Sequence, residues 1–181
     1  MFSKTFVATL AVVPFVAQSV AAADCARSYT IQAGDICDSI SQKNNVSTYQ
    51  LAVVNYGKID QTCSNLNPGD SLCLGYPGED CTTTYTVQKD DDCSAVMSAR
   101  GLNTTIFSAN NPQIDSSCSN MYIGQVLCMA ETVQVPPAPS GVSFYGAQVP
   151  ATATPVQALA AAPTPTPDDE DDENLPFCDE L

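Results

Sequence analysis

The sequence contains no histidine, and only six of its 181 residues are lysine or arginine. Without histidine the chain cannot build a Ser/His or Cys/His nucleophilic centre. It also lacks the paired C-x2-C spacings of structural zinc sites. We therefore expect no metal, no cofactor and no enzymatic activity. The twenty acidic residues give a net charge of −14, and this balance argues against binding to nucleic acid or to an anionic membrane.

Long apolar stretches are absent beyond the first residues. Met1 to Lys4 carry one positive side chain, Thr5 to Ala17 is apolar, and small residues lead up to Ala23. This pattern predicts a secretory signal peptide over residues 1–23, because its apolar part is too short to span a bilayer. We expect a soluble protein that is secreted into the extracellular space, where association with the cell wall is an open alternative.

What the sequence does have is a repeated cysteine pattern. Eight of its nine cysteines fall into two sets, spaced C-x11-C-x25-C-x9-C and C-x11-C-x24-C-x9-C. The text between them repeats as well, since CARSYTIQ matches CTTTYTVQ and IDQTCSNL matches IDSSCSNM. We infer a tandem duplication of a unit of about 50 residues. The cysteines are Cys25, Cys37, Cys63 and Cys73 in unit one and Cys81, Cys93, Cys118 and Cys128 in unit two.

Export through an oxidising compartment permits disulfides, and domains this small usually need them. Four cysteines in a unit make two bridges, for which three connectivities exist. We favour pairing the first cysteine with the third and the second with the fourth. The ninth cysteine, Cys178, has no partner in this scheme, so it is either a free thiol or the site of a bridge between two chains.

Each unit is predicted to contain a strand, two helices and a strand, in that order. In unit one, Asp35 is placed to cap the first helix and Ser47 to cap the second. The strands are expected at 29–32 and 71–74 in unit one and at 85–88 and 125–129 in unit two, whose helices are expected at 92–100 and 104–109.

The chain therefore divides into several parts. Residues 25–75 form the first domain and residues 85–130 the second, whose cysteine unit starts at Cys81. The linker, 76–84, is short, so the units sit close but need not pack together. Nine of the 13 prolines follow Thr132, together with an acidic run. This composition predicts a disordered Pro/Thr/Ala-rich acidic tail over residues 131–181.

Two Asn-X-Ser/Thr sequons, at Asn45 and Asn103, fall between the predicted helices of each unit. A turn at the surface of a secreted protein is accessible to glycosylation. We therefore predict N-glycosylation at these two positions.

The segments YTIQAGDICDSI and LNPGDSLCL of unit one resemble a LysM domain, and the four-cysteine form is similar to secreted fungal LysM proteins. The resemblance implies an α+β fold class, with two tandem, small, disulfide-stapled βααβ domains. It also implies binding of N-acetylglucosamine polymers, either chitin or peptidoglycan, in a shallow groove between two loops. One loop joins the first strand to the first helix, and the other joins the second helix to the second strand.

The resemblance assigns ligand-binding residues by position. Ile59 and Ile114 are candidates for apolar contact with the sugar, and Tyr56 for ring stacking. Unit two carries three aspartates, 90–92, where unit one keeps Gly-Asp, so we favour unit one as the stronger binder. The loops comprise Gly34, Asp35, Ile36, Asn55, Tyr56, Gly57, Lys58, Ile59 and Asp60 in unit one, and Asp90, Asp91, Asp92, Asn111, Pro112, Gln113, Ile114 and Asp115 in unit two.

These features favour a secreted, non-catalytic chitin-binding protein that sequesters chitin fragments or shields a cell wall. Adjacent carboxylates on a turn do not form the separated acid/base pair of a glycosidase, and the chain leaves no room for a catalytic domain. The alternative is a wall-associated structural or adhesion protein, with the tail as a glycosylated stalk. Self-association through a shared ligand or through Cys178 is a further expectation.

Overall fold

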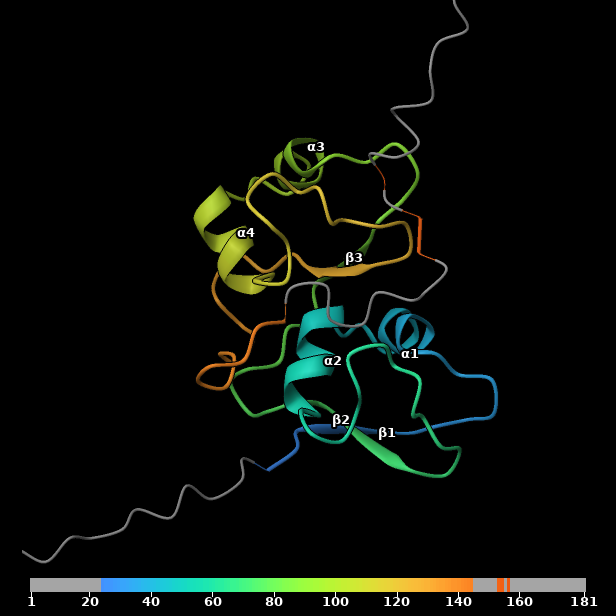
Figure 1. Cartoon of the computed structure of the whole chain (residues 1–181). Helices are drawn as coiled ribbons and strands as arrows, with labels where there is room; N and C mark the ends of the chain where they lie inside the picture. Colours follow the sequence, from blue (N-terminus) through green and yellow to red (C-terminus); the bar gives the residue numbers. More distant parts are fainter. Residues whose placement is uncertain (1–23, 145–152, 155, 157–181) are drawn as a thin grey trace, which may run out of the picture.

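The computed structural model describes residues 24–144, 153–154 and 156. In each unit two strands pair in antiparallel fashion and two helices lie between them in the chain, which confirms the α+β class and the predicted order (Figure 1). The predicted signal peptide and Cys178 lie outside the described residues. Unit one comprises β1 (Arg27–Thr30), α1 (Cys37–Asn44), α2 (Thr48–Val54) and β2 (Ser71–Gly75), and unit two comprises β3 (Thr84–Thr86), α3 (Cys93–Ser98), α4 (Thr104–Asn110) and β4 (Val126–Cys128).

The ends of the strands differ from their predicted bounds by at most two residues. β1 begins before residue 29 and ends at Thr30, although the Ile31 amide still donates to the Asp70 carbonyl at 2.9 Å. The registers are equivalent in the two units, since Tyr29 lies opposite Leu72 and Tyr85 lies opposite Leu127.

The predicted cap at Ser47 is confirmed, because its side chain accepts a hydrogen bond from the Gln50 amide. The predicted cap at Asp35 is wrong. Ile36 occupies the N-cap position of α1, and the Asp35 carboxylate instead accepts from the Gln32 amide and the Tyr29 hydroxyl, both at 2.7 Å. Asp35 thus closes the turn that precedes the helix. Short-range bonding of Asp to nearby backbone competes in this way with capping.

The predicted disulfide pairing is also wrong. The bridges are Cys25–Cys73, Cys37–Cys63, Cys81–Cys128 and Cys93–Cys118, so the first cysteine of each unit pairs with the fourth and the second with the third. The reason is the sheet: its two antiparallel strands bring the ends of each unit side by side. The Cα atoms of Cys25 and Cys73 are 5.6 Å apart, which is a suitable distance for a disulfide.

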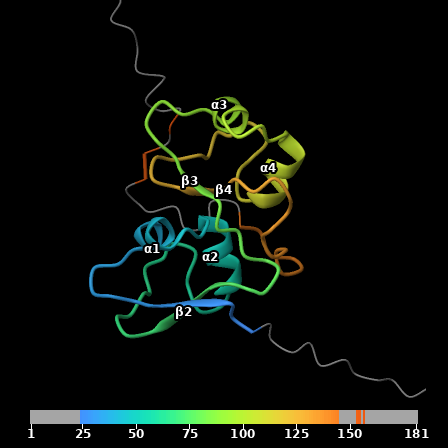
Figure 2. The ribbon, with the colours of Figure 1, turned by 180° about the vertical axis from the view of Figure 1, so that it is seen from behind.

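The two units pack on each other in alternating layers. Helices α1 and α2 of unit one lie between their own sheet and the sheet of unit two, while α3 and α4 lie on the far side of that second sheet (Figures 1 and 2). The burial pattern agrees: β4 is buried at all three positions, whereas β2 alternates between exposed and buried at its start. The short linker therefore joins packed units.

Polar contacts fix this interface. The Tyr122 hydroxyl donates to the Asp38 carboxylate at 2.9 Å, and both residues are buried. The Val126 amide donates to the Thr48 hydroxyl at 3.0 Å. Burial raises the pKa of Asp38 to about 6, against the opposing effect of the Tyr122 hydrogen bond.

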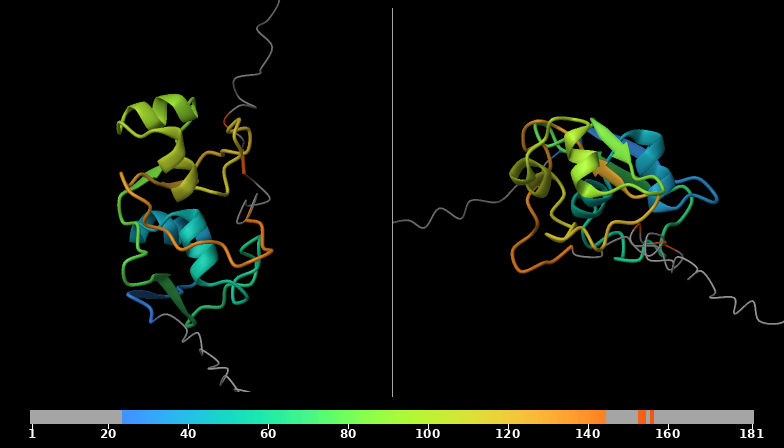
Figure 3. Two further views of the ribbon diagram at one scale, coloured as in Figure 1. Left: turned by 90° about the vertical axis from the view of Figure 1, so that its left-hand side faces the viewer. Right: turned by 90° about the horizontal axis from the view of Figure 1, so that it is seen from above.

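The first part of the expected disordered tail is ordered. Residues 131–144, named the strap here, leave unit two and run beside α2 (Figure 3). The Tyr49 hydroxyl donates to the Pro136 carbonyl at 3.0 Å, and burial raises the pKa of Tyr49 to about 12. Val135 and Phe144 are buried in an apolar cluster with residues of α2. Burial of these two side chains holds in place a segment whose composition predicts disorder. The rest of the tail, including its acidic run, lies outside the described residues except at 153–154 and 156.

Candidate functional site

The first loop of each unit forms the same turn. Asp91 accepts from the Gln88 amide at 2.7 Å and from the Tyr85 hydroxyl at 2.8 Å, as Asp35 does in unit one. The backbone hydrogen bond from Gln32 lowers the pKa of Asp35.

Gly34 has a φ of 87°, and Asp90 adopts the same left-handed region with a φ of 67°. Aspartate is among the few residues other than glycine that visit this region. Asp90 and Asp91 therefore keep the turn that Gly34 and Asp35 form in unit one, and Asp92 caps α3 by accepting from the Ala95 amide at 2.9 Å.

The second loop starts at a buried asparagine in each unit. The Asn55 amide nitrogen donates to the carbonyls of Leu51 and Cys73, and its oxygen accepts from the Cys73 amide at 2.9 Å. Asn111 makes the equivalent bonds to Phe107 and Cys128. These side chains connect the start of the loop to the last strand of each unit. Because both asparagines are buried, they support the loop from the interior of the unit.

A second carboxylate shapes the far part of this loop. Asp60 accepts from the amides of Thr62 and Ser64, both at 2.9 Å. Asp115 accepts from the amides of Ser117 and Ser119 at 2.9 and 3.0 Å. The serine hydroxyls add further hydrogen bonds, and together these lower the pKa of each aspartate to about 2.

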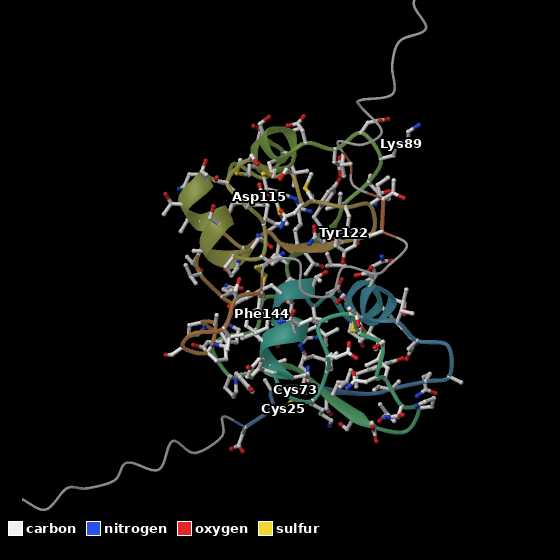
Figure 4. All side chains as sticks on the ribbon, viewed as in Figure 1. Cys25, Cys73, Lys89, Asp115, Tyr122 and Phe144 are labelled. Atoms are coloured by element: carbon white, nitrogen blue, oxygen red, sulfur yellow. A yellow bond between two sulfur atoms is a disulfide. The ribbon has the colours of Figure 1, made fainter. Side chains whose placement is uncertain are left out.

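In unit two the two predicted loops meet in one groove of about 400 Å³. The first loop contributes Asp91 and Asp92, and the second contributes Ile114, Asp115 and the residues up to Cys118. Figure 4 shows the position of Asp115 beside the two helices of unit two. The floor includes residues that the sequence prediction did not name, which are Met97, Phe107 and Met121, with Val156 from the C-terminal segment.

In unit one the groove has a different second wall. It has a volume of about 330 Å³ and is lined by Tyr56 to Gln61, by Ala52 and Asn65, and by Phe144 of the strap. The first loop, Gly34 to Ile36, is not part of this lining. Tyr56 is 55% exposed, so its ring is available to a ligand.

Several predicted residues make contacts other than those expected of a ligand-binding residue. Pro112 lies beside the strap in a separate hollow. Gln113 is buried, and its side-chain nitrogen and oxygen find no hydrogen-bond partner among the described residues. The Lys58 ammonium donates to the Ser71 carbonyl, although the residue also lines the groove of unit one. Thr104, Phe107 and Ser108 are three and four residues apart, so they share one face of α4. This spacing in the sequence could have predicted that α4 contributes to the groove of unit two.

Fold and grooves together define a tandem pair of small, disulfide-stapled α+β modules with loop-built surface grooves. The sequence model of the LysM domain matches residues 29–75 and 85–130, just over half of the chain. The chain therefore belongs to the LysM domain family.

Named relatives are much longer than the matched region. The chain is 38% identical over 116 residues to a secreted LysM effector of Pochonia chlamydosporia, covering 62% of this chain and 16% of that protein. It is 28% identical to the non-secreted LysM effector LCP1 of Gibberella moniliformis, covering 75% and 18%. It is 26% identical to the probable chitinase LysM18 of Penicillium expansum, covering 70% and 10%. The chain thus spans less than a fifth of each of these relatives.

Proposed function

We propose that the chain is a non-catalytic binding protein for N-acetylglucosamine oligomers such as chitin fragments. The observation that carries this proposal is the groove of unit two, in which both expected binding loops meet. A relative named as a probable chitinase adds support for chitin as the polymer.

The lining of this groove suits such a sugar. N-acetylglucosamine is neutral and presents an amide, several hydroxyls and an apolar ring face, so it needs an apolar surface with a few polar groups. The groove offers Met97, Phe107 and Ile114 beside the side chains of Ser94 and Ser108. Because both loops line it, we rank unit two as the stronger site, which reverses the ranking made from the loop sequences.

The acidic residues of the groove do not suit catalysis. A glycosidase needs a carboxylic acid with a raised pKa opposite a second carboxylate. Hydrogen bonds lower the pKa of Asp92, chiefly the one from Ser94, and they lower the pKa of Asp115 to about 2. Both groups are therefore ionised, and neither is suited to donate a proton to a leaving group.

The setting of this binding is proposed to be extracellular. The predicted signal peptide and the relatives named as secreted effectors support export. Asn45 and Asn103 are both exposed, as glycosylation sites must be. The stalk alternative has less support, because residues 131–144 pack against α2 and do not extend away from the domains. Among the described residues, no helix has the length and apolarity to cross a membrane.

Titration calorimetry of the chain from residue 24, folded under oxidising conditions, tests the proposal. N-acetylglucosamine hexamer should give saturable heat, and cellohexaose, which lacks the acetamido group, should give none. Met97→Ala in unit two should weaken binding more than Tyr56→Ala in unit one. Equal heats from the two sugars would contradict recognition of the N-acetyl group, and no heat from either would remove the proposal.

A further inference from the structure

The residues that follow unit two return to both grooves. The strap is anchored first on unit two, where the Asn110 amide nitrogen donates to the Thr132 carbonyl at 2.9 Å and its oxygen accepts from the Gln134 amide at 2.9 Å. It then crosses to unit one, where Tyr49 binds the Pro136 carbonyl. Its path therefore depends on side chains of both units.

Phe144 ends this path at the groove of unit one. Its ring packs edge-on against Tyr49 with centroids 5.5 Å apart, and against Tyr56 with centroids 6.0 Å apart. Phe144 is 7% exposed, and it lies beside α2 in Figure 4. It also lines the groove together with Gly57 and Ile59. The lining of the unit-one groove therefore includes a residue of the strap and none of the first loop.

Val156 makes the corresponding contact in unit two. Its amide donates to the Met121 carbonyl at 3.1 Å, and the Ile123 amide donates to the Thr154 carbonyl at 3.1 Å. Val156 is buried in the core cluster of unit two and lines the groove that holds Ile114. One C-terminal segment thus supplies an apolar side chain to each of the two grooves.

We propose that Phe144 and Val156 are ligand-contacting residues, so that each sugar site is completed by chain outside its own LysM unit. This inference rests on the proposed function. An aromatic ring beside Tyr56 suits the apolar face of a pyranose ring or the methyl of an acetamido group. The aliphatic Val156 offers a smaller contact of the same kind. Phe144 is then a determinant of affinity in unit one, where the first loop is not part of the groove lining.

The test is a titration of the 15N-labelled full chain with N-acetylglucosamine tetramer, followed by NMR. The amide of Gly57 reports on unit one and that of Ser117 reports on unit two, so each unit is the internal control for the other. Phe144→Ala should weaken binding at Gly57 by about 2- to 10-fold and leave Ser117 unchanged. Val156→Ala should weaken binding at Ser117 by about 3-fold and leave Gly57 unchanged.

Two variants separate contact from folding. Val135 is buried in the same cluster as Phe144 but does not line the groove, so Val135→Ala should lower stability and leave both binding midpoints unchanged. Phe144→Leu keeps apolar packing but removes the ring, so it should stay folded and still bind more weakly at Gly57.

The outcomes distinguish this inference from the proposed function. Unchanged binding at Gly57 in both Phe144 variants, or equal weakening by Val135→Ala, overturns the inference and leaves the proposed function standing. An absence of shifts at both amides in the unaltered chain overturns the proposed function, and the inference falls with it.

Discussion

The two units share a hydrogen-bond framework and differ in what lies around it. The buried asparagines at 55 and 111 and the turn aspartates at 35 and 91 make the same bonds in each copy. Their surroundings differ, because unit two has its sheet covered on both faces and its groove walled by both loops, whereas the groove of unit one is walled by the strap. The framework sets the fold, and neighbouring chain decides what each groove presents.

The largest expected difference between the units concerns their outer disulfides. The bridges Cys25–Cys73 and Cys81–Cys128 close loops of nearly equal length, 48 and 47 residues, so their chain-entropy contributions are the same. Cys81 and Cys128 are fully buried in the cluster between the units, whereas Cys25 is exposed. Replacing both cysteines of the buried bridge with alanine should cost about 5 kcal/mol of unfolding free energy, against about 3 kcal/mol for the exposed one. Urea denaturation measures both, and equal losses would mean that the burial between the units contributes nothing.

The hydrogen bonds that the two units share predict equal losses of stability when the corresponding residue is replaced in either unit. Asn55→Ala and Asn111→Ala each remove three hydrogen bonds and leave buried backbone groups without partners, which should cost about 3 kcal/mol each. The losses should agree because the bonded atoms correspond in the two copies. Urea denaturation of the two single variants gives this comparison, with Ser108→Ala, on the exposed side of α4, as the control for a neutral substitution. A loss confined to one unit would show that the two frameworks are not equivalent.

The contact between the units should depend on pH. Asp38 is buried against Tyr122, and its counterpart in unit two, Ser94, is exposed. Because the pKa of Asp38 is raised to about 6 from an unfolded value of 3.8, its contribution is most favourable below pH 4 and is lost as the pH rises to 6. Asp38→Asn keeps an oxygen to accept from Tyr122 and cannot ionise, so at pH 7 it should be more stable than the unaltered chain by about 2 kcal/mol.

The difference in stability between the unaltered chain and Asp38→Asn separates the effect of Asp38 from that of the other carboxylates. Those with lowered pKa values, such as Asp60 and Asp115, stabilise the fold at neutral pH and lose that effect on acidification in both chains alike. Thermal unfolding at pH 4 and pH 7 measures the difference, which should vanish at pH 4. A difference that stays constant between the two pH values would refute the assignment.

The sequence predicted what its repeats and local patterns determine. The strand, helix, helix, strand order and the cap at Ser47 follow from residue types at fixed spacings. The disulfide pairing did not follow, because it depends on which strands lie side by side. The role of Asn55 was missed for the same reason, since its partner Cys73 is 18 residues away. The strap was missed because Val135 and Phe144 are isolated apolar residues whose partners lie in α2.

The smallest expected effect concerns one of the positions at which the two turns differ in sequence, Gly34 in unit one and Asp90 in unit two. Gly34 and Asp90 share a left-handed backbone conformation, and no atom lies within 4 Å of the point where a side chain on Gly34 would begin. Substitution there therefore tests the backbone alone. Gly34→Asp should cost about 1 kcal/mol of unfolding free energy and Asp90→Gly should gain about as much, offset in part because glycine also frees the unfolded chain.

Denaturation of the two single variants and of the double variant checks this exchange. The double variant should match the unaltered chain, because the two turns lie in different units and share no partners. Effects of the same sign at both positions would mean that the aspartate at 90 contributes more than its backbone conformation. In that case the acidic turn of unit two would be a feature of its groove and not a substitute for glycine.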